Sequence, residues 1–465
     1  MRIGVLAFYG RQKKPVASNR IYGLCQGLSK QGLEVYLFTI PTSLGSEECF
    51  DLSFCKDIVE FSAFPIPFSL YEMGRRMLQK VVLRGLFPRS LEAQRARERT
   101  RWLSAFQEIR KKLWHWRYSS PVFRDDTKSG GYFVFRGFTA LKLLRYIWEN
   151  NVRVLFTSHG PSMSHELGLY LKRKMGTDIY WVADFRDPMV GDSYVFIESS
   201  KKLRKLQRDT FVFADLVTMV SHSMIQDALE FARAEGIDVD KKKFFCLYNG
   251  FSAVNLVPDS VEGFLPAKKL RVSYTGTIYP GKQDLTTLLH ALSHLSETER
   301  QDVEFVYAGR QADFVRRLVE EHHLSSCCRV LGEVSKETAL QIQRSSDVLL
   351  LLKSDDDRGI FTGKYFEYLS SGRPILVLGD KDEEFNKVAL NMGGVRIVPN
   401  GSRGVKEIVE ILKALLTKDI DSQERIWTLF GERKMEEVNR FHWDYLSRCL
   451  YERIVRDLED GVFIT

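Results

Sequence analysis

Short apolar runs recur along the chain and alternate with segments in which apolar residues are spaced three or four positions apart. The runs cover residues 2–8, 34–40, 152–158, 179–185, 215–221, 243–250, 270–276, 303–309, 328–334, 347–352, 374–380 and 395–399. The runs have the length of buried strands, and the segments between them have the periodicity of amphipathic helices. Strands that alternate with helices are typical of βα units in a parallel sheet. The pattern therefore predicts an α/β protein.

The alternation is interrupted at residues 256–269, where LVPDSVEGFLPAKK is rich in proline, glycine and charge. Such a segment is typical of a linker, and a chain of 465 residues is long enough for two hydrophobic cores. We predict two Rossmann-like, doubly wound parallel-sheet domains, at 1–255 and 270–422, that face each other across a cleft. Residues 423–465 are helical by pattern, and we expect them to pack back toward the first domain.

Composition narrows the class of protein. The longest uninterrupted apolar run, VLLLL at 348–352, is far shorter than the ~20 residues that a membrane-spanning helix needs. The N-terminal MRIGVLAFYGRQKK has too short an apolar part for a signal peptide and is expected to form the first buried strand. Seven cysteines, an odd number, favour a reducing compartment over a disulfide framework. We therefore expect a cytoplasmic protein, either soluble or peripheral on the inner face of the cell membrane.

The net charge of +8 is unevenly distributed. Lysines and arginines far outnumber acidic residues between Arg75 and Arg117, where Trp102, Trp114 and Trp116 also lie. Cationic and aromatic side chains together are typical of a segment that binds anionic lipid. A helical insertion at about 70–120 with a solvated basic face would have the same composition. No nucleic-acid recognition motif accompanies the charge, so we expect no nucleic-acid partner.

One glycine-rich loop resembles the phosphate-binding loop of nucleoside triphosphatases. Gly276, Gly281 and Lys282 form the pattern G-x-x-x-x-G-K between a predicted strand and a predicted helix. The hydroxyl that such a loop needs after its lysine to hold Mg²⁺ is replaced by the amide of Gln283. The sequence therefore favours a strand–loop–helix unit of some other nucleotide-binding fold.

Polar residues also follow predicted strands of the first domain. His159 comes directly after one strand, and ADFRDP places Asp184 and Asp187 after the next. Open α/β sheets bind ligands at the carboxyl ends of their strands, where Asn19 is also expected. His159 can donate to a sugar hydroxyl or a leaving phosphate, or can simply satisfy its turn. The two aspartates form either an internal salt-bridged corner or ligands of a substrate.

RGIFTGKYFEYLSSGRPIL, at 358–376, is the most distinctive segment. Gly363 and Lys364 open a predicted helix that carries Glu367 three residues after the lysine, so both side chains face the same side. A helix N-terminus favours phosphate, and the lysine adds a positive charge. A glutamate one turn along can accept hydrogen bonds from both hydroxyls of a ribose. The alternative is an ordinary capped helix with a surface Lys–Glu pair.

Two further patterns carry less weight. HHLSSCC, at 322–328, has the residue types of a zinc site, but its adjacent pairs point to opposite sides of a helix or strand. SDDD, at 354–357, resembles an acidic metal-binding motif, but its place just before the Gly-Lys pair favours a solvated loop. We therefore expect no metal site.

These motifs, in this order, resemble the glycosyltransferases of GT-B architecture and are most similar to the retaining glycosyltransferase family 4. The similarity is carried by Ser18-Asn19-Arg20, SHGPSMSH, VADFRDP, YNGF, YTGTIYPGK, YAGR and, most specifically, TGKYFEYLSSGRPIL. The resemblance implies that the first domain binds an acceptor and that the second binds a nucleotide-diphospho-sugar donor. It also implies retention of configuration at the anomeric carbon and no obligatory metal or other cofactor.

The resemblance also assigns roles to residues. Glu367 matches the glutamate that holds the ribose, and Gly363 and Lys364 lie near the nucleotide. The loops that face the phosphates contain Gly276, Lys282 and Arg310, of which Lys282 would neutralise charge on the leaving nucleotide. His159 matches a histidine that touches the transferred sugar in some members, and the acceptor side contains Asn19, Asp184 and Asp187.

The chain departs from the family at one position. Many members have two glutamates separated by seven residues, and Gly359 stands where the first would be. That glutamate usually faces the donor sugar, so the identity of the sugar stays open. We expect a hexosyltransferase-like enzyme of polysaccharide biosynthesis that transfers a sugar to a lipid-linked or cell-surface glycan. The alternatives are a non-catalytic nucleotide-sugar sensor or scaffold, which Gly359 allows, and a P-loop-like triphosphatase, which Gln283 disfavours.

Overall fold

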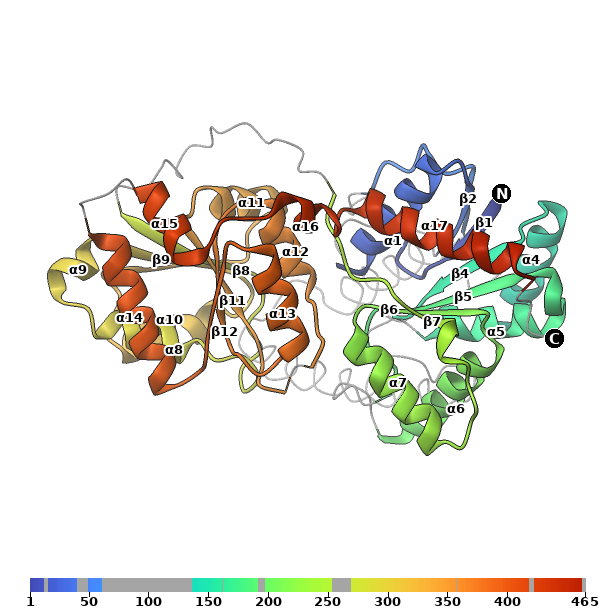
Figure 1. Ribbon diagram of the computed structural model, residues 1–465, viewed down its shortest axis with the longest axis horizontal. Helices are drawn as coiled ribbons and strands as arrows, with labels where there is room; N and C mark the ends of the chain where they lie inside the picture. The colour runs from blue at the N-terminus through green and yellow to red at the C-terminus, as the bar shows by residue number, and fades with distance from the viewer. Residues whose placement is uncertain are drawn as a thin grey trace, which may run out of the picture. The chain divides into compact units, whose positions relative to one another are not determined.

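The computed structural model divides into two compact units, each built around one sheet (Figure 1). It describes residues 1–11, 16–39, 49–60, 136–160, 162–190, 197–252, 269–356, 358–417 and 422–461. The first unit comprises Met1–Met219, Ala228–Phe245 and Ser447–Thr465, and the second comprises Val220–Asp227 and Cys246–Leu446. The first unit is therefore assembled from three separate stretches of the chain.

The first unit has a seven-stranded sheet in the order β3-β2-β1-β4-β5-β6-β7. β1 pairs in parallel with β2 and β4, and the pairs β2–β3, β4–β5 and β5–β6 are also parallel. β4, β5 and β6 are buried along their whole length, as expected for strands covered on both faces. The strands are β1 (Arg2–Leu6), β2 (Glu34–Thr39), β3 (Asp57–Glu60), β4 (Val154–Ser158), β5 (Tyr180–Phe185), β6 (Leu216–Met219) and β7 (Phe244–Cys246).

Helices connect these strands, because parallel neighbours need a crossover. α5 packs on β4 and β5 and against α6. The helices are α1 (Val16–Lys30), α4 (Arg136–Glu149), α5 (Met163–Met175) and α6 (Ile197–Phe213), with the short 3-10 helices η1 (Gly176–Asp178) and η2 (Lys241–Lys243). Two more helices, α7 (His222–Ala234) and α17 (Trp443–Glu459), contain residues of both units.

The stretch from Ser447 onward is held in the first unit by polar contacts. The Ser447 hydroxyl donates to the carbonyl oxygen of Leu24 at 3.4 Å. The hydroxyl of Tyr180, on β5, donates to Oδ2 of Asp457 at 2.5 Å, and Arg453 Nε donates to Oδ1 of the same aspartate at 2.9 Å. Burial raises the pKa of Tyr180 far above its ordinary value, and the Asp457 carboxylate raises it further, so the phenol remains a donor.

The second unit has a six-stranded sheet in the order β10-β9-β8-β11-β12-β13, with parallel pairing between all neighbours. Alternate residues of β11 enter different cores: Leu350 and Leu352 pack in one cluster, and Leu349 and Leu351 in another. This period of two is expected for a strand buried on both faces. The strands are β8 (Leu270–Thr275), β9 (Val303–Ala308), β10 (Cys328–Gly332), β11 (Val348–Leu352), β12 (Ile375–Leu378) and β13 (Val395–Val398).

Helices again follow the strands of this unit (Figure 1). α8 packs against α14, and α11 packs against β8. The helices are α8 (Thr286–Ser293), α9 (Glu297–Gln301), α10 (Ala312–Glu321), α11 (Lys336–Arg344), α12 (Gly363–Ser370), α13 (Glu383–Met392), α14 (Ser402–Leu416), α15 (Ser422–Phe430) and α16 (Met435–Asn439).

The predicted α/β class with two parallel sheets is confirmed, and every predicted strand overlaps an observed one. The sequence pattern missed β3, which is four residues long and has one fully buried side chain, so it carries almost no periodic signal. The basic segment from Arg75 to Arg117 and the predicted linker up to residue 268 lie outside the described residues. Within the described part of the chain, no helix is long and apolar enough to cross a membrane.

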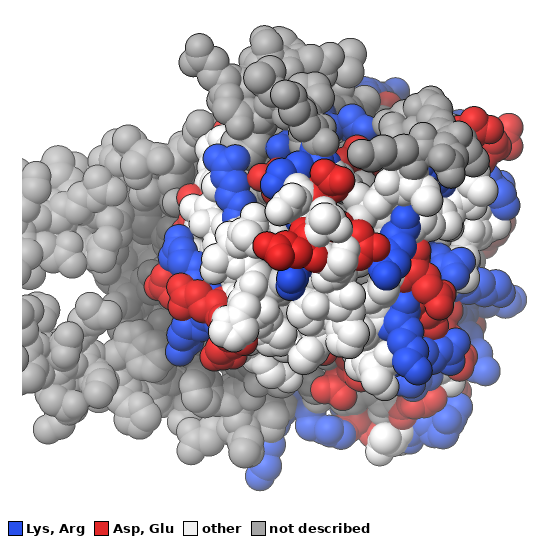
Figure 2. Space-filling model, turned by 90° about the vertical axis from the view of Figure 1, so that its left-hand side faces the viewer, with Lys and Arg blue, Asp and Glu red and all other residues white. Residues whose placement is uncertain are grey.

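The end of the second unit on which α9 and α14 lie has a mixed charge. Figure 2 shows Lys and Arg side chains interspersed with Asp and Glu among the coloured residues of this face. Lys413 on α14 and Glu299 on α9 form one such pair, with Nζ and Oε1 3.5 Å apart. Because opposite charges lie side by side, the coloured part of this face presents no single-sign field to a polyanion.

Candidate functional site

Both sheets reverse their strand order at one place, between β1 and β4 in the first unit and between β8 and β11 in the second. In open α/β sheets, ligands bind beside such a point, at the carboxyl ends of the strands. The candidate residues of each unit are therefore those that follow these strands.

At the end of β8 the chain turns at Gly276, whose φ of 134° is one that other residues rarely adopt. Its N–H donates to the carbonyl oxygen of Ala308 at 2.7 Å. A Cβ atom on Gly276 would lie 2.5 Å from Nζ and 2.6 Å from Cε of Lys364. The glycine thus leaves the space that the Lys364 side chain occupies, which brings two of the predicted site residues into contact.

The loop that follows Gly276 is anchored by Gln283. Its Oε1 accepts from the backbone N–H of Tyr279 at 3.2 Å, and its Nε2 donates to the carbonyl oxygen of Leu352 at 3.1 Å. The amide that replaces the hydroxyl of a phosphate-binding loop therefore ties this loop to the end of β11. Lys282, the next residue back, is exposed on the same loop.

Lys364 lies in the first turn of α12 and points at Tyr274. Its Nζ is 3.8 Å from the centroid of the Tyr274 ring and hydrogen-bonds to the hydroxyl of the same residue. Burial lowers the pKa of Lys364 to about 7, although the nearby Glu367 carboxylate raises it. The amine therefore lies beside the glycine-rich turn, and its pKa is close to neutral pH, so its charge can change there.

Glu367, one turn along α12, belongs to a connected set of polar side chains. Its Oε1 accepts from Nε2 of Gln343 at 2.5 Å, and its Oε2 pairs with the Nζ of Lys336. The same Gln343 Nε2 donates to Oγ1 of Thr275 at 2.8 Å, and the N–H of Thr275 donates to the Tyr368 hydroxyl at 2.9 Å. Residues from β8, α11 and α12 together therefore hold the carboxylate at the end of β8.

Gly363 and Arg310 complete the predicted donor residues. Gly363 is the first residue of α12, and the side chain of the N-cap Thr362 makes no capping hydrogen bond among the described residues. The N–H groups of that first turn are thus not satisfied by the cap side chain. Arg310 follows β9 and pairs with Glu333, with Nε and Oε1 3.3 Å apart and both side chains largely exposed.

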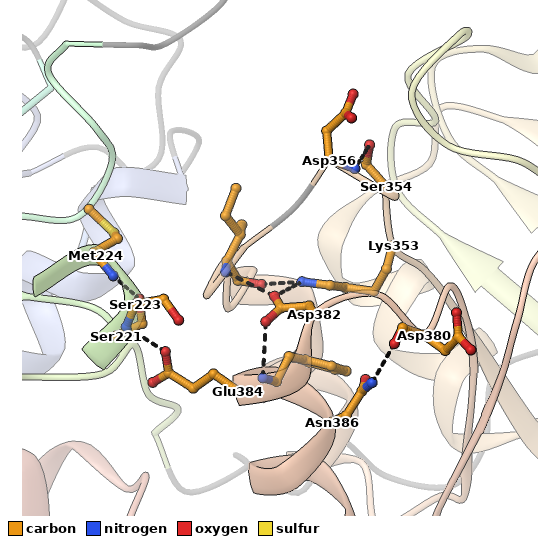
Figure 3. A network of polar contacts seen from close by, with 12 residues as sticks. Ser221, Ser223, Met224, Lys353, Ser354, Asp356, Asp380, Asp382, Glu384 and Asn386 are labelled. Atoms are coloured by element: carbon orange, nitrogen blue, oxygen red, sulfur yellow. Dashed lines mark hydrogen bonds and ion pairs between the residues drawn. The ribbon is translucent and has the colours of Figure 1, made fainter. Parts of the chain in front are cut away.

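A buried ion pair closes the loop between β11 and α12 (Figure 3). Lys353 and Asp382 are each 2% exposed, and Nζ lies 2.9 Å from Oδ2. Lys353 Nζ also donates to the carbonyl oxygen of Ile360 at 2.6 Å, and the Ile360 N–H donates to Asp382 Oδ2 at 3.2 Å. Asp382 Oδ1 caps α13 by accepting from the N–H of Phe385 at 3.1 Å. The pair therefore fixes both backbone polar groups of the loop residue next to Gly359.

Gly359 has a φ of 63° and is packed against residues just before and at the start of α7. A Cβ atom at this position would lie 2.4 Å from Cβ of Ser223 and 2.7 Å from Oγ of Ser221. Glu384, on α13, accepts from the N–H of Ser223 at 2.6 Å and from the hydroxyl of Tyr248 at 3.0 Å (Figure 3 shows the serine contact). The position of the first family glutamate thus has no space for a side chain here, and a different carboxylate lies beside the same serine.

In the first unit, His159 follows β4 and is buried, with 8% of its surface exposed. Its N–H donates to the carbonyl oxygen of Asp184 at 2.8 Å, and its own carbonyl oxygen accepts from Nε of Arg186 at 2.8 Å. The pKa of its ring is lowered to about 4, chiefly by burial; the Asp187 and Asp184 carboxylates oppose this decrease, and the Arg186 guanidinium contributes to it. At neutral pH the ring is uncharged.

Asp184 is fully buried and forms a structural ion pair with Arg20 of α1. The guanidinium donates to it twice, from Nε to Oδ2 at 3.0 Å and from Nη2 to Oδ1 at 2.6 Å. The hydroxyl of Ser158 donates to Oδ2 at 2.8 Å, and that of Thr218 donates to Oδ1 at 2.7 Å. With four donors on two oxygens, this aspartate makes the contacts expected of the internal salt-bridged corner.

The other two predicted acceptor-side residues are exposed. Asn19 lies on the surface of α1, one residue before Arg20, and Asp187 has a 59% exposed side chain with Oδ2 3.6 Å from Nη2 of Arg186. Both side chains are thus accessible on the first unit.

The sequence analysis missed buried polar residues that contact the predicted site residues or lie beside them, among them Gln343 and His165. Both are polar residues inside predicted helices, and only the fold shows what their side chains contact.

Comparisons with known proteins agree with this architecture. Residues 269–418, which contain β8 to β13, match the sequence profile of the family described as glycosyl transferases group 1. No curated protein sequence matches the chain significantly.

Solved structures show the same fold over nearly the whole chain. Sucrose-phosphate synthase from Thermosynechococcus elongatus has a TM-score of 0.61 at 14% identity, with 99% of this chain and 100% of that chain covered. HepE from Anabaena, solved in complex with UDP-glucose, has a TM-score of 0.57 at 13% identity, with 98% and 100% covered. The lipopolysaccharide outer core galactosyltransferase WaaB has a TM-score of 0.53 at 12% identity, with 98% and 100% covered. The chain therefore has two Rossmann-like domains and the GT-B fold of these proteins.

Proposed function

We propose that the protein is a glycosyltransferase that moves a sugar from a nucleotide-diphospho-sugar donor to a hydroxyl of a glycan acceptor. One observation carries the proposal. Lys364, at the start of α12, packs against Gly276 at the β8–β11 switch point, and Glu367 lies one turn further along the same helix. A helix N-terminus, a partly buried amine and a carboxylate one turn apart match the phosphate and ribose of one nucleotide. The match of this segment to glycosyl transferases group 1 supports the same function.

In this proposal the second unit binds the donor. Glu367 accepts from the ribose hydroxyls after releasing Lys336, and Lys364 faces the diphosphate from the N-terminus of α12. Lys282 and Arg310, both exposed on neighbouring loops, add positive charge against the leaving nucleotide. Fixed positive charges can stabilise such a leaving group as a divalent cation would, so we propose a reaction without an obligatory metal. We also propose retention at the anomeric carbon, on the resemblance to family 4.

The acceptor is assigned to the first unit, where His159 donates to the reacting sugar. The accessible side chains of Asn19 and Asp187 are candidates for its recognition. We propose a lipid-linked or cell-surface glycan intermediate as the acceptor, used by a cytoplasmic enzyme of polysaccharide biosynthesis. If the basic segment from Arg75 to Arg117 attaches the enzyme to anionic lipid, vesicles that contain phosphatidylserine should co-sediment it in low salt, and neutral vesicles should not.

Ligand binding and then turnover test the proposal. UDP, GDP, ADP and CDP are compared by thermal shift, with UDP first because the Anabaena relative was solved with UDP-glucose. A ligand that binds the folded state raises the melting temperature according to its concentration over Kd. We expect one nucleotide to raise it, and the corresponding nucleotide sugar to be consumed when an acceptor is present. If no nucleotide changes the melting temperature, the donor site is assigned wrongly.

Gly359 supports a second candidate, a nucleotide-sugar sensor without catalysis. Its left-handed backbone and its contact with Ser223 leave no space for a carboxylate that faces the donor sugar. The sensor binds the nucleotide sugar but neither transfers nor hydrolyses it, so product formation by the purified protein excludes it. A triphosphatase is less compatible, because both polar atoms of Gln283 are bonded to backbone groups.

A further inference from the structure

A row of buried polar side chains lies behind His159 in the first unit. Nε1 of Trp181, on β5, donates to Oγ1 of Thr157, on β4, at 2.9 Å. Oγ1 of Thr157 lies 2.9 Å from Nδ1 of His165, on α5. Trp181 and His165 are 0% exposed, as is Thr157, so these contacts are made out of reach of solvent.

The direction of each hydrogen bond follows from the chemistry of the groups. An indole N–H can only donate, so the threonine oxygen accepts from Trp181. The threonine hydroxyl can then donate to Nδ1 of His165, and this direction is favoured because the opposite one would leave the buried hydroxyl proton without an acceptor among the described residues. A neutral imidazole with an acceptor at Nδ1 carries its proton on Nε2. Burial lowers the pKa of His165 well below its ordinary value, and neighbouring His159 lowers it further, which keeps the ring neutral.

The result is a buried N–H donor and a buried acceptor on two neighbouring rings. Nε2 of His165 and Nδ1 of His159 are both buried without a hydrogen-bond partner among the described residues. The two ring centroids are 5.9 Å apart, too far for a direct hydrogen bond between the ring nitrogens as they stand, but within reach of one bridging water or of a small approach of the rings. Orphaned buried polar atoms are rare, and these two have complementary roles.

We propose that His165 is a positioning residue that donates to Nδ1 of His159 and thereby fixes the proton of His159 on Nε2. With Nδ1 as the acceptor, the N–H of His159 is on Nε2, in a residue at the end of β4 that keeps 8% of its surface exposed. His159 is then a neutral hydrogen-bond donor to an oxygen of the reacting sugar, and it does not accept a proton from the substrate. This role in the reaction rests on the proposed function.

A glycine in α5 makes the arrangement possible. A Cβ atom on Gly168 would lie 2.7 Å from Nε1 of Trp181 and 2.8 Å from Cγ2 of Thr157. Glycine in a helix interior is unfavourable by roughly 0.5–1 kcal/mol relative to alanine. The glycine at position 168 leaves space for the Trp181 indole to reach the Thr157 hydroxyl.

Other groups around the two rings define the competing arrangement. The carbonyl oxygen of Asp184 lies close enough to His165 to raise its pKa, and it already accepts the N–H of His159. The charged groups that face His159 are Asp184, Arg186 and Asp187, all at the end of β5. If His165 donates to that carbonyl instead, His159 is not coupled to Thr157, and the two arrangements give different spectra.

The test is ¹⁵N NMR of the full-length protein labelled on histidine, with the signals assigned from His159→Gln and His165→Gln. We expect both residues in the neutral form with the proton on Nε2 between pH 5.5 and 8. Thr157→Val should change the nitrogen shifts of His165 and also those of His159, and Thr157→Ser should restore both. Thr210→Val is the matched control, because Thr210 is buried in the same unit and donates only to the carbonyl oxygen of Leu206.

A His159 ring protonated on Nδ1, or a His159 spectrum that does not change in Thr157→Val, would overturn the proposal. Kinetics give a second readout if sugar transfer is found. The loss of one orienting hydrogen bond should lower kcat roughly 3- to 10-fold in Thr157→Val, with donor affinity and the Thr210→Val rate unchanged. Because the NMR measurement needs no substrate, failure of the proposed function and failure of this inference are distinguishable.

Discussion

The Nζ atom of Lys364 lies over the ring of Tyr274, 3.8 Å from its centroid, and hydrogen-bonds to the hydroxyl of the same side chain. The amine is thus held by an aromatic residue of β8, beside the turn at Gly276, whose φ of 134° other residues rarely adopt. Burial lowers its pKa to about 7, and an incoming diphosphate would reverse this shift because opposite charge favours the protonated amine.

We therefore expect nucleotide binding to take up a proton. At pH 8 most of the free protein has a neutral Lys364, whose pKa is about 7, and the bound diphosphate stabilises the charged form, so uptake approaches one proton. The measurement is calorimetry of UDP binding in buffers of different ionisation enthalpy. Lys364→Met should abolish the uptake and weaken binding.

Lys282→Met is the matched control for this experiment. Lys282 is exposed on the neighbouring loop, so its loss should weaken binding without changing the number of protons taken up. Equal proton uptake by the wild type and Lys364→Met would show that the amine does not respond to the ligand.

Glu367→Gln should weaken nucleotide binding. The substitution keeps the size of the side chain and removes the charge that accepts from the ribose, and a hydrogen bond to a charged group contributes about 1.5–3 kcal/mol. We expect Kd to rise by roughly 10- to 150-fold, measured by calorimetry. Glu407→Gln, which removes a charge from an i,i+4 pair with the exposed Arg403 on α14, should leave Kd unchanged. An unaltered Kd in Glu367→Gln would assign the ribose to other residues.

Gly359→Ala should be more destabilising than Gly372→Ala. Both glycines have positive φ, 63° and 73°, so both variants pay the same backbone strain of about 1 kcal/mol. Only at Gly359 does the added Cβ also meet another residue, Ser223, at 2.4 Å, whereas nothing lies within 4 Å at Gly372. Urea denaturation of the two variants measures the difference. Equal losses of stability would mean that the loop moves away from α7 without resistance.

Stability should fall in acid through His159. Its pKa is about 4 in the folded protein and about 6.5 in the unfolded chain. Between these values the unfolded chain binds more protons, so the free energy of unfolding decreases as the pH falls through this window. The contribution of His159 at pH 5 is about 2 kcal/mol smaller than at pH 7.5.

His159→Gln should therefore lose about 2 kcal/mol less stability than the wild type between pH 7.5 and pH 5. Urea denaturation at the two pH values measures this loss. His290→Gln, at an exposed position on α8, should lose as much as the wild type. If His159→Gln loses as much stability as the wild type between the two pH values, the ring is already accessible to protons in the folded state.

Most of the fold was predictable because its strands are buried on both faces. Such strands read as uninterrupted apolar runs, and VLLLL of β11 is predicted to within one residue. β3, with a single buried side chain, could not be found in this way. The helix that opens with Gly363 and carries Glu367 was also predictable, since a period of 3.6 decides which of its side chains share a face.

The partners of the site residues could not be predicted. Gln343 lies 24 residues before Glu367, and Tyr274 lies 90 before Lys364, so their contacts depend on the sheet order and not on local spacing. The contacts of Asp184 could not be predicted either, because Arg20, which pairs with it, lies 164 residues away in the sequence. His165 was visible in SHGPSMSH, but only the packing of α5 on β4 shows that its ring contacts Thr157.

The return of the last helix to the first unit has a consequence for biosynthesis. Tyr180 of β5 is translated 277 residues before Asp457, the carboxylate that accepts a hydrogen bond from its hydroxyl. Domains generally fold as units while the chain emerges from the ribosome. All of the second unit, Val220–Asp227 and Cys246–Leu446, is translated before Ser447–Thr465. The unit that starts first should therefore finish last, and a nascent chain stalled before Ser447 should expose the buried surface that α17 later covers.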